Sequence, residues 1–69
     1  MLGQKIKYHR ERKGLTQKFI AEKIGVDVST ISKIENSKAD PSLKMLRSIA
    51  VVLDVPASVL IEEDNNYNF

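Results

Sequence analysis

A chain of 69 residues has room for one small domain, and this chain contains no Cys and a single His. These counts exclude a disulfide, a thiol nucleophile and a zinc site built from Cys or several His. The net charge of +2 conceals an asymmetry, because residues 1–53 carry all 11 Lys and Arg with five acidic residues, a net +6, whereas residues 54–69 carry four acidic residues and no base. A basic body favours a polyanionic partner, although solvated helix faces would give the same balance.

The first expected helix spans residues 2–13, because side chains suited to packing recur every three or four residues from Leu2 onward and Gly14 ends the pattern. His9 falls on this inward stripe. Its ring is expected to pack there half-buried, with a pH switch as the alternative.

Two short helices joined by a tight turn are expected next. Thr16 is suited to cap a second helix, and Gly25 favours the left-handed conformation that follows a helix end. Asp27 is suited to cap a third helix that runs to about Glu35. This combination predicts a helix-turn-helix.

Two further helices are expected after a loop over residues 36–40. Pro41 fits the first turn of a fourth helix, where its missing N–H is not needed, and the apolar face of that helix ends at Leu53. Pro56 begins a short fifth helix. The chain then divides into a domain over residues 1–61 and an acidic, polar tail over residues 62–69.

Several fixed spacings agree with one known family. They are Gly14-Leu15-Thr16-Gln17, Ile20-Ala21-x-x-Ile24-Gly25-Val26, Ser29-Thr30-Ile31-Ser32-Lys33-Ile34-Glu35-Asn36 and Pro41-Ser42-Leu43. The chain resembles the phage repressor and Cro-like helix-turn-helix family, also called the xenobiotic-response-element (XRE) family. The resemblance spans residues 3–61. It implies an all-α, compact five-helix bundle of the lambda-repressor type that binds operator DNA, usually as a dimer.

The third expected helix has a surface suited to the major groove, which is about 12 Å wide. Its outward face carries short side chains, and the resemblance implies that Val28, Ser29 and Lys33 face base edges. Ser32 lies on the same face and is also expected to read bases. Lys33 can donate to guanine, whereas Val28 can at most contact a thymine methyl group. The alternatives for Lys33 are a phosphate contact or a free surface charge.

The resemblance also implies contacts with the DNA backbone. Gln17 would clamp a phosphate at the start of the second helix, and Thr16 either joins it or acts only as a cap. Asn36 and Lys38 resemble a second phosphate-contacting segment, and Lys44 is placed to reach the same backbone.

The resemblance also implies a structural ion pair between Arg10 of the first helix and Glu35 of the third.

Phe19 departs from the family pattern, which often has Glu at this position. It either marks a partner surface or folds back on Tyr8 or the first helix.

The C-terminal helices hold more apolar residues than so small a core needs. We therefore expect a two-fold dimer contact there, with the alternative that these residues all close the monomer core. The expected interface residues are Val51, Val55, Val59, Leu60 and Ile61. The aromatic residues of the tail, Tyr67 and Phe69, either add to this contact or are disordered.

The sequence thus predicts a sequence-specific, DNA-binding transcriptional regulator, a repressor, that binds a pseudo-palindromic operator as a homodimer. An antitoxin or adaptor of the same fold, which mainly binds a protein partner, is the alternative. Neither is an enzyme, and no cofactor or metal is expected. The longest apolar run, residues 49–53, is too short for a membrane span and the N-terminus lacks a signal peptide, so a cytoplasmic location is expected.

Overall fold

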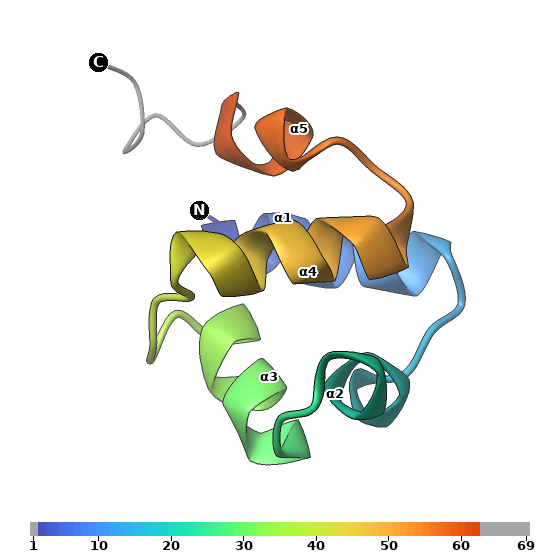
Figure 1. Cartoon of the computed structure of the whole chain (residues 1–69), viewed down its shortest axis with the longest axis vertical. Helices are drawn as coiled ribbons and strands as arrows, with labels where there is room; N and C mark the ends of the chain where they lie inside the picture. The colour runs from blue at the N-terminus through green and yellow to red at the C-terminus, as the bar shows by residue number, and fades with distance from the viewer. Residues whose placement is uncertain (1, 63–69) are drawn as a thin grey trace.

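The computed structural model describes residues 2–62, and this range contains five α-helices and no β-strand. The prediction of an all-α, five-helix fold is confirmed. The expected tail aromatics, Tyr67 and Phe69, lie outside the described residues. The helices are α1 (Leu2–Arg12), α2 (Gln17–Ile24), α3 (Val28–Glu35), α4 (Leu43–Leu53) and α5 (Ala57–Glu62) (Figure 1).

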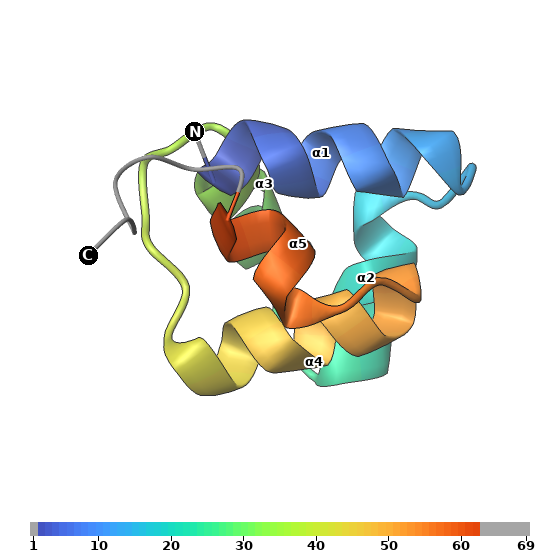
Figure 2. The ribbon, with the colours of Figure 1, turned by 90° about the horizontal axis from the view of Figure 1, so that it is seen from above.

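The helices are arranged so that α2 and α3 form one end of the molecule. In Figure 1, α1 and α4 lie across the middle, with α5 on one side of them and α2 and α3 on the other. The view from above shows α5 seated between α1 and α4 (Figure 2). The helix-turn-helix therefore projects from the end opposite α5.

All five helices contribute to one hydrophobic core. The spacing of three and four residues that predicted the helices also places one apolar stripe of each helix inward. Burying these side chains is the main stabilising force available to a small domain without a disulfide. The buried apolar residues are Leu2, Ile6, Ile20, Ala21, Ile31, Ile34, Leu46, Ile49, Ala50, Leu53 and Leu60.

The ends of α2 follow the sequence prediction. The Phe19 backbone N–H donates to the Thr16 side chain at 3.0 Å, which satisfies one of the amides left free at a helix start. Gly25 adopts the left-handed conformation, with φ of 77°. This conformation is readily available to glycine, so the chain can turn sharply into α3.

One predicted side-chain cap and one predicted helix start are wrong. Asp27 occupies the cap position of α3, but its side chain makes no capping hydrogen bond, since the Thr30 amide is already bonded to the Asp27 carbonyl oxygen at 3.0 Å. Helix α4 begins at Leu43 and not at residues 40–41. Ser42 is its cap, with its hydroxyl accepting from the Met45 amide at 3.1 Å.

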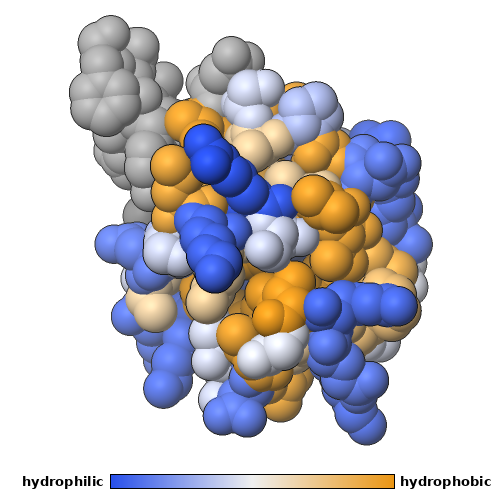
Figure 3. All heavy atoms as spheres, in the orientation of Figure 1, coloured by the Kyte–Doolittle hydropathy of each residue, from blue (hydrophilic) through white to orange (hydrophobic). Residues whose placement is uncertain are grey.

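The C-terminal apolar residues divide between the core and the surface. Leu60 is fully buried, so the expectation that it lies at an exposed interface is wrong for the single chain. Val55 and Ile61 are half-buried and pack against the core, and Val59 is also half-buried. Val51 is 78% exposed. Figure 3, in the orientation of Figure 1, shows hydrophobic side chains beside hydrophilic ones on the face that includes α4.

Candidate nucleic-acid interface

Helix α3 presents an outward face of small and polar side chains. It turns its isoleucines into the core, so Val28, Ser29 and Lys33 are exposed and Ser32 is partly exposed. Val28, the first residue of the helix, is 47% exposed, although it is apolar. The four residues predicted to read bases thus share one accessible side of α3, which carries no bulky side chain that would keep it out of a groove.

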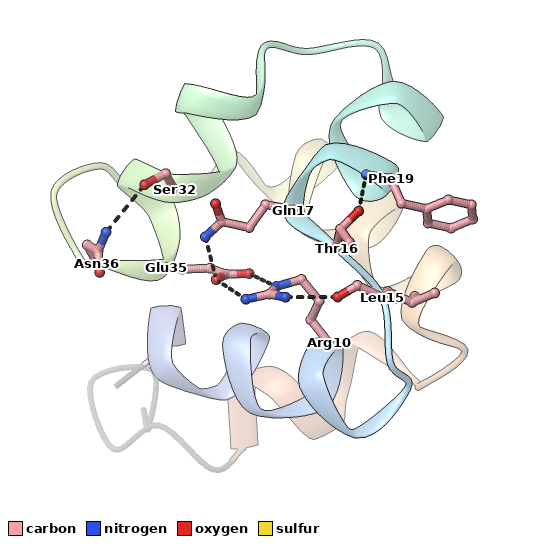
Figure 4. A network of polar contacts seen from close by, with 8 residues as sticks. All are labelled: Arg10, Leu15, Thr16, Gln17, Phe19, Ser32, Glu35 and Asn36. Atoms are coloured by element: carbon pink, nitrogen blue, oxygen red, sulfur yellow. Dashed lines mark hydrogen bonds and ion pairs between the residues drawn. The ribbon is translucent and has the colours of Figure 1, made fainter.

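A buried ion pair joins α1 to the last turn of α3. Arg10 Nε donates to Glu35 Oε2 at 2.7 Å, and Arg10 Nη2 donates to Glu35 Oε1 at 3.0 Å (Figure 4). Glu35 is 3% exposed, and it is the buried charged side chain in the described part of the chain. The ion pair implied by the family resemblance is therefore present, with bidentate geometry.

Arg10 also reaches the segment that leads into α2. Its Nη1 donates to the Leu15 carbonyl oxygen at 2.8 Å. The hydrogen bond to Glu35 raises the pKa of the Arg10 guanidinium, while burial opposes the rise. A raised arginine pKa contributes stability at every pH below its ordinary value and loses it only as the pH rises through the raised value. This contact therefore holds α1, α3 and the start of α2 together across the neutral range.

Gln17 is the second residue that binds the Glu35 carboxylate, and it donates the third hydrogen bond. Its Nε2 donates to Glu35 Oε1 at 2.9 Å, so the first residue of α2 is bonded to the last residue of α3. A primary amide carries two N–H groups, which leaves a second donor for a phosphate at the start of α2. Sequence reasoning missed this bond, since a polar contact between two helices leaves no periodic signal in the sequence.

Phe19 does not fold back on α1. It is 40% exposed, and the Lys23 ammonium lies 5.4 Å from its ring centroid. Figure 4 shows its ring pointing away from the polar network around Glu35. Tyr8 instead contacts its own helix, with its ring centroid 5.2 Å from that of His9. The aromatic side chains of α1 and α2 are thus separate surface features.

The predicted phosphate contacts after α3, which are Asn36, Lys38 and Lys44, are all exposed. Asn36 Nδ2 donates to Ser32 Oγ at 3.4 Å, which ties the loop to the outward face of α3. The Lys38 backbone N–H donates to the Lys33 carbonyl oxygen at 2.8 Å, so the loop folds back on the helix. Lys44 is exposed in the first turn of α4.

Most of the chain fits a known family model. Residues 6–60 match the model described as helix-turn-helix. The chain belongs to the helix-turn-helix family. This membership confirms the resemblance drawn from the sequence motifs.

Two HTH-type transcriptional regulators are similar in sequence to this chain. The uncharacterized HTH-type transcriptional regulator MJ0272 of Methanocaldococcus jannaschii is 44% identical over 65 residues, which are 93% of this chain and 98% of that protein. The HTH-type transcriptional regulator SinR of Bacillus subtilis is 39% identical over 70 residues, which are 100% of this chain and 63% of SinR. The helix-turn-helix chain described here thus spans less than two thirds of SinR.

Solved structures share the fold. A structure of SinR in complex with DNA has a TM-score of 0.80 and 41% identity, and covers 87% of this chain and 97% of that one. A complex of SinR with SinI has a TM-score of 0.83 at 41% identity, and covers 91% of this chain and 62% of that one. The P22 c2 repressor with a synthetic operator has a TM-score of 0.84 at 23% identity, and covers 93% of this chain and 97% of that one.

These relatives are named as regulators and repressors, which bears out the expectation that this helix-turn-helix chain is not an enzyme. No helix within residues 2–62 is long and apolar enough to cross a membrane.

Proposed function

We propose that this protein is a sequence-specific, DNA-binding transcriptional regulator that inserts α3 into the major groove. The observation that carries the proposal is the outward face of α3, where Val28, Ser29 and Lys33 are exposed while the rest of the helix is anchored in the core. The 41% identity to SinR, whose structure was solved with DNA, supports the same function. The proposal includes a cytoplasmic location, because the protein must reach the DNA that it binds.

The side chains of α3 suit direct reading of base edges. Lys33 would donate to guanine O6 and N7, Ser29 would donate or accept, and Val28 would contact a thymine methyl group. Gln17, whose amide keeps one N–H after bonding Glu35, would bind a phosphate together with the free amides at the start of α2. The remaining proposed phosphate contacts are Thr16, Asn36, Lys38 and Lys44.

Repression by occupancy of an operator fits the relatives. The immunity repressor of Bacillus phage phi105 is 35% identical over 63 residues, which are 91% of this chain and 44% of that protein. One recognition helix reads only a few base pairs, so we propose a homodimer on two half-sites of a pseudo-palindromic operator. Its interface would centre on exposed Val51, with Val55, Val59 and Ile61 at its edge.

Replacement of Lys33 by Ala tests the role of α3. If Lys33 reads a base, Lys33→Ala weakens binding to the preferred duplex by about 1–3 kcal/mol and relaxes the choice at one base position. Fluorescence anisotropy on a panel of single-base operator variants measures both effects. Lys7→Ala removes the same charge from the exposed side of α1 and is the matched control.

Two results would count against this assignment. Equal losses on every duplex, with a shallower salt dependence, would make Lys33 a phosphate contact. If Lys33→Ala and Lys7→Ala behave alike, then α3 does not enter the groove and the proposed function fails.

A second candidate function is a protein-interaction module of the same fold, such as an antitoxin or adaptor. The exposed Phe19 and Val51 favour it, because exposed apolar side chains are available to contact a protein partner. SinR itself has been solved in complex with the SinI protein. A stoichiometric protein partner, together with no preference among duplexes, would promote this candidate over the first.

A further inference from the structure

The first turn of α1 lies directly against the last turn of α3. Gly3 is buried at this crossing. A Cβ atom added to Gly3 would stand 2.9 Å from the Glu35 carbonyl oxygen and 3.1 Å from the Glu35 carbonyl carbon, and it would overlap the Ile34 carbonyl oxygen. These are backbone atoms, which cannot move aside as a flexible side chain can. Only a hydrogen atom fits between the two helices at this point.

The close approach of α1 and α3 accounts for a glycine at position 3, whereas the backbone conformation does not require one. Gly3 lies within a helix, and it is absent from the glycines that have positive φ. Alanine is a better helix former than glycine, so helix stability alone would favour a side chain here. The sequence pattern gave no reason to single out Gly3, and its role emerges only from the contact with α3.

Helix α1 holds the end of α3 at a second point. Arg10 lies seven residues after Gly3, which is two turns of a helix, and it binds the Glu35 carboxylate at 2.7 Å and 3.0 Å. The same residue of α3 is therefore contacted through its backbone by Gly3 and through its side chain by Arg10. Figure 2 shows α1 passing over α3 near the start of α1. Both contacts between α1 and α3 therefore involve the last turn of α3.

We propose that Gly3 is a positioning residue for DNA recognition. Its missing side chain allows α1 and α3 to approach closely, and this approach gives α3 the position and orientation in which Val28, Ser29 and Lys33 can enter the major groove. The inference rests on the proposed DNA-binding function. A recognition helix must be held within about 0.5 Å and 10–20° of its productive geometry, so a methyl group forced into this crossing disturbs reading without touching DNA.

The test compares Gly3→Ala with Gly14→Ala. Gly14 has φ of 69°, and a Cβ added there meets no atom within 4 Å beyond its chain neighbours, so its replacement strains the backbone without inserting an atom between α1 and α3. Circular dichroism and urea titration establish that each variant is folded under the conditions used. NMR residual dipolar couplings of the free proteins then measure the orientation of α3 relative to α1, and anisotropy measures affinity for the preferred duplex.

The expected result is a changed α3 orientation in Gly3→Ala alone, with a loss of affinity of about tenfold or more beyond that of Gly14→Ala, the scale of one base contact. Wild-type orientation with wild-type affinity in folded Gly3→Ala would overturn the inference. A variant that stays unfolded even in an osmolyte that favours compact states would also overturn it, because Gly3 would then serve folding. If wild-type protein binds no duplex selectively, the proposed function fails, while the dipolar couplings still decide whether Gly3 sets the helix orientation.

Discussion

Glu35 is the residue on which the geometry of the helix-turn-helix depends most. It accepts two hydrogen bonds from Arg10 and one from Gln17, so a single buried carboxylate connects α1, α2 and α3. The buried charge of Glu35 is tolerated because both of its carboxylate oxygens accept hydrogen bonds, from Arg10 and Gln17. Loss of Arg10 would leave the Glu35 carboxylate buried without a counter-charge.

Removal of Arg10 should therefore strongly destabilise the domain. Arg10→Met leaves Glu35 buried without its counter-charge, and the expected loss in free energy of unfolding is about 3–5 kcal/mol. The double variant Arg10→Met/Glu35→Leu contains no buried charge and should recover most of this loss. Urea titration of the wild type, both single variants and the double variant measures the coupling. Additive losses in the double variant would show that the pair does not act as a unit.

His9 differs from Glu35 because its buried polar atom is not hydrogen-bonded. Its Nε2 is buried and has no hydrogen-bond partner. An unsatisfied buried polar atom costs about 1–3 kcal/mol, which outweighs the 0.5–1.5 kcal/mol or so of an aromatic edge contact such as that with Tyr8. His9→Leu should therefore raise the free energy of unfolding by about 1 kcal/mol. Thermal and urea unfolding test this, with His9→Ala as the control that also removes packing. A less stable His9→Leu variant would contradict the account.

At the scale of the elements, the helix caps differ in whether their side chains make the capping hydrogen bond that the sequence predicts. Thr16 and Ser42 each accept a backbone hydrogen bond, whereas Asp27 does not. Thr16→Ala and Ser42→Ala should each lower the free energy of unfolding by about 1 kcal/mol, while Asp27→Ala should change it by a few tenths at most. Urea titrations of the three variants measure the difference. A loss at Asp27 equal to that at Thr16 would contradict the observed capping.

The sequence was sufficient to place the helices because local signals coincide there. Apolar spacing, the Thr16 cap and the glycine after α2 all indicate the same boundaries, and α1 and α2 were predicted to within a residue at their ends. The start of α4 was misplaced because Pro41 and Ser42 are both acceptable near a helix start. Only the hydrogen bond from the Met45 amide to Ser42 decides between them.

The candidate site was predicted as a set of residues but not as a connected structure. The family motif names Gln17 and Glu35, but nothing in it shows that they are bonded to each other. Leu60 was assigned to the surface because apolar content alone does not reveal which side of a short helix faces the core. Gly3 was missed for a related reason, since a close approach of two backbones is a property of the fold.

At the scale of the whole molecule, Val51 should govern self-association. It is 78% exposed, so Val51→Asp should leave the fold intact and shift the protein towards monomer. Sedimentation equilibrium across a range of concentrations measures the change. Leu60→Ala is the contrasting variant: Leu60 is fully buried, so this change should destabilise the monomer by about 2–5 kcal/mol. A Val51→Asp variant that associates as strongly as the wild type would place the dimer contact elsewhere.

Selection from a random duplex DNA pool at about 150 mM salt tests the central claim most directly, with the mass of the complex measured on the same sample. The account predicts an enriched motif with two-fold symmetry, half-sites about one helical turn apart, and two protein chains on each duplex. Salt-sensitive binding with no enriched motif would contradict sequence recognition by α3. The exposed apolar side chains would then point to a protein partner as the target of this fold.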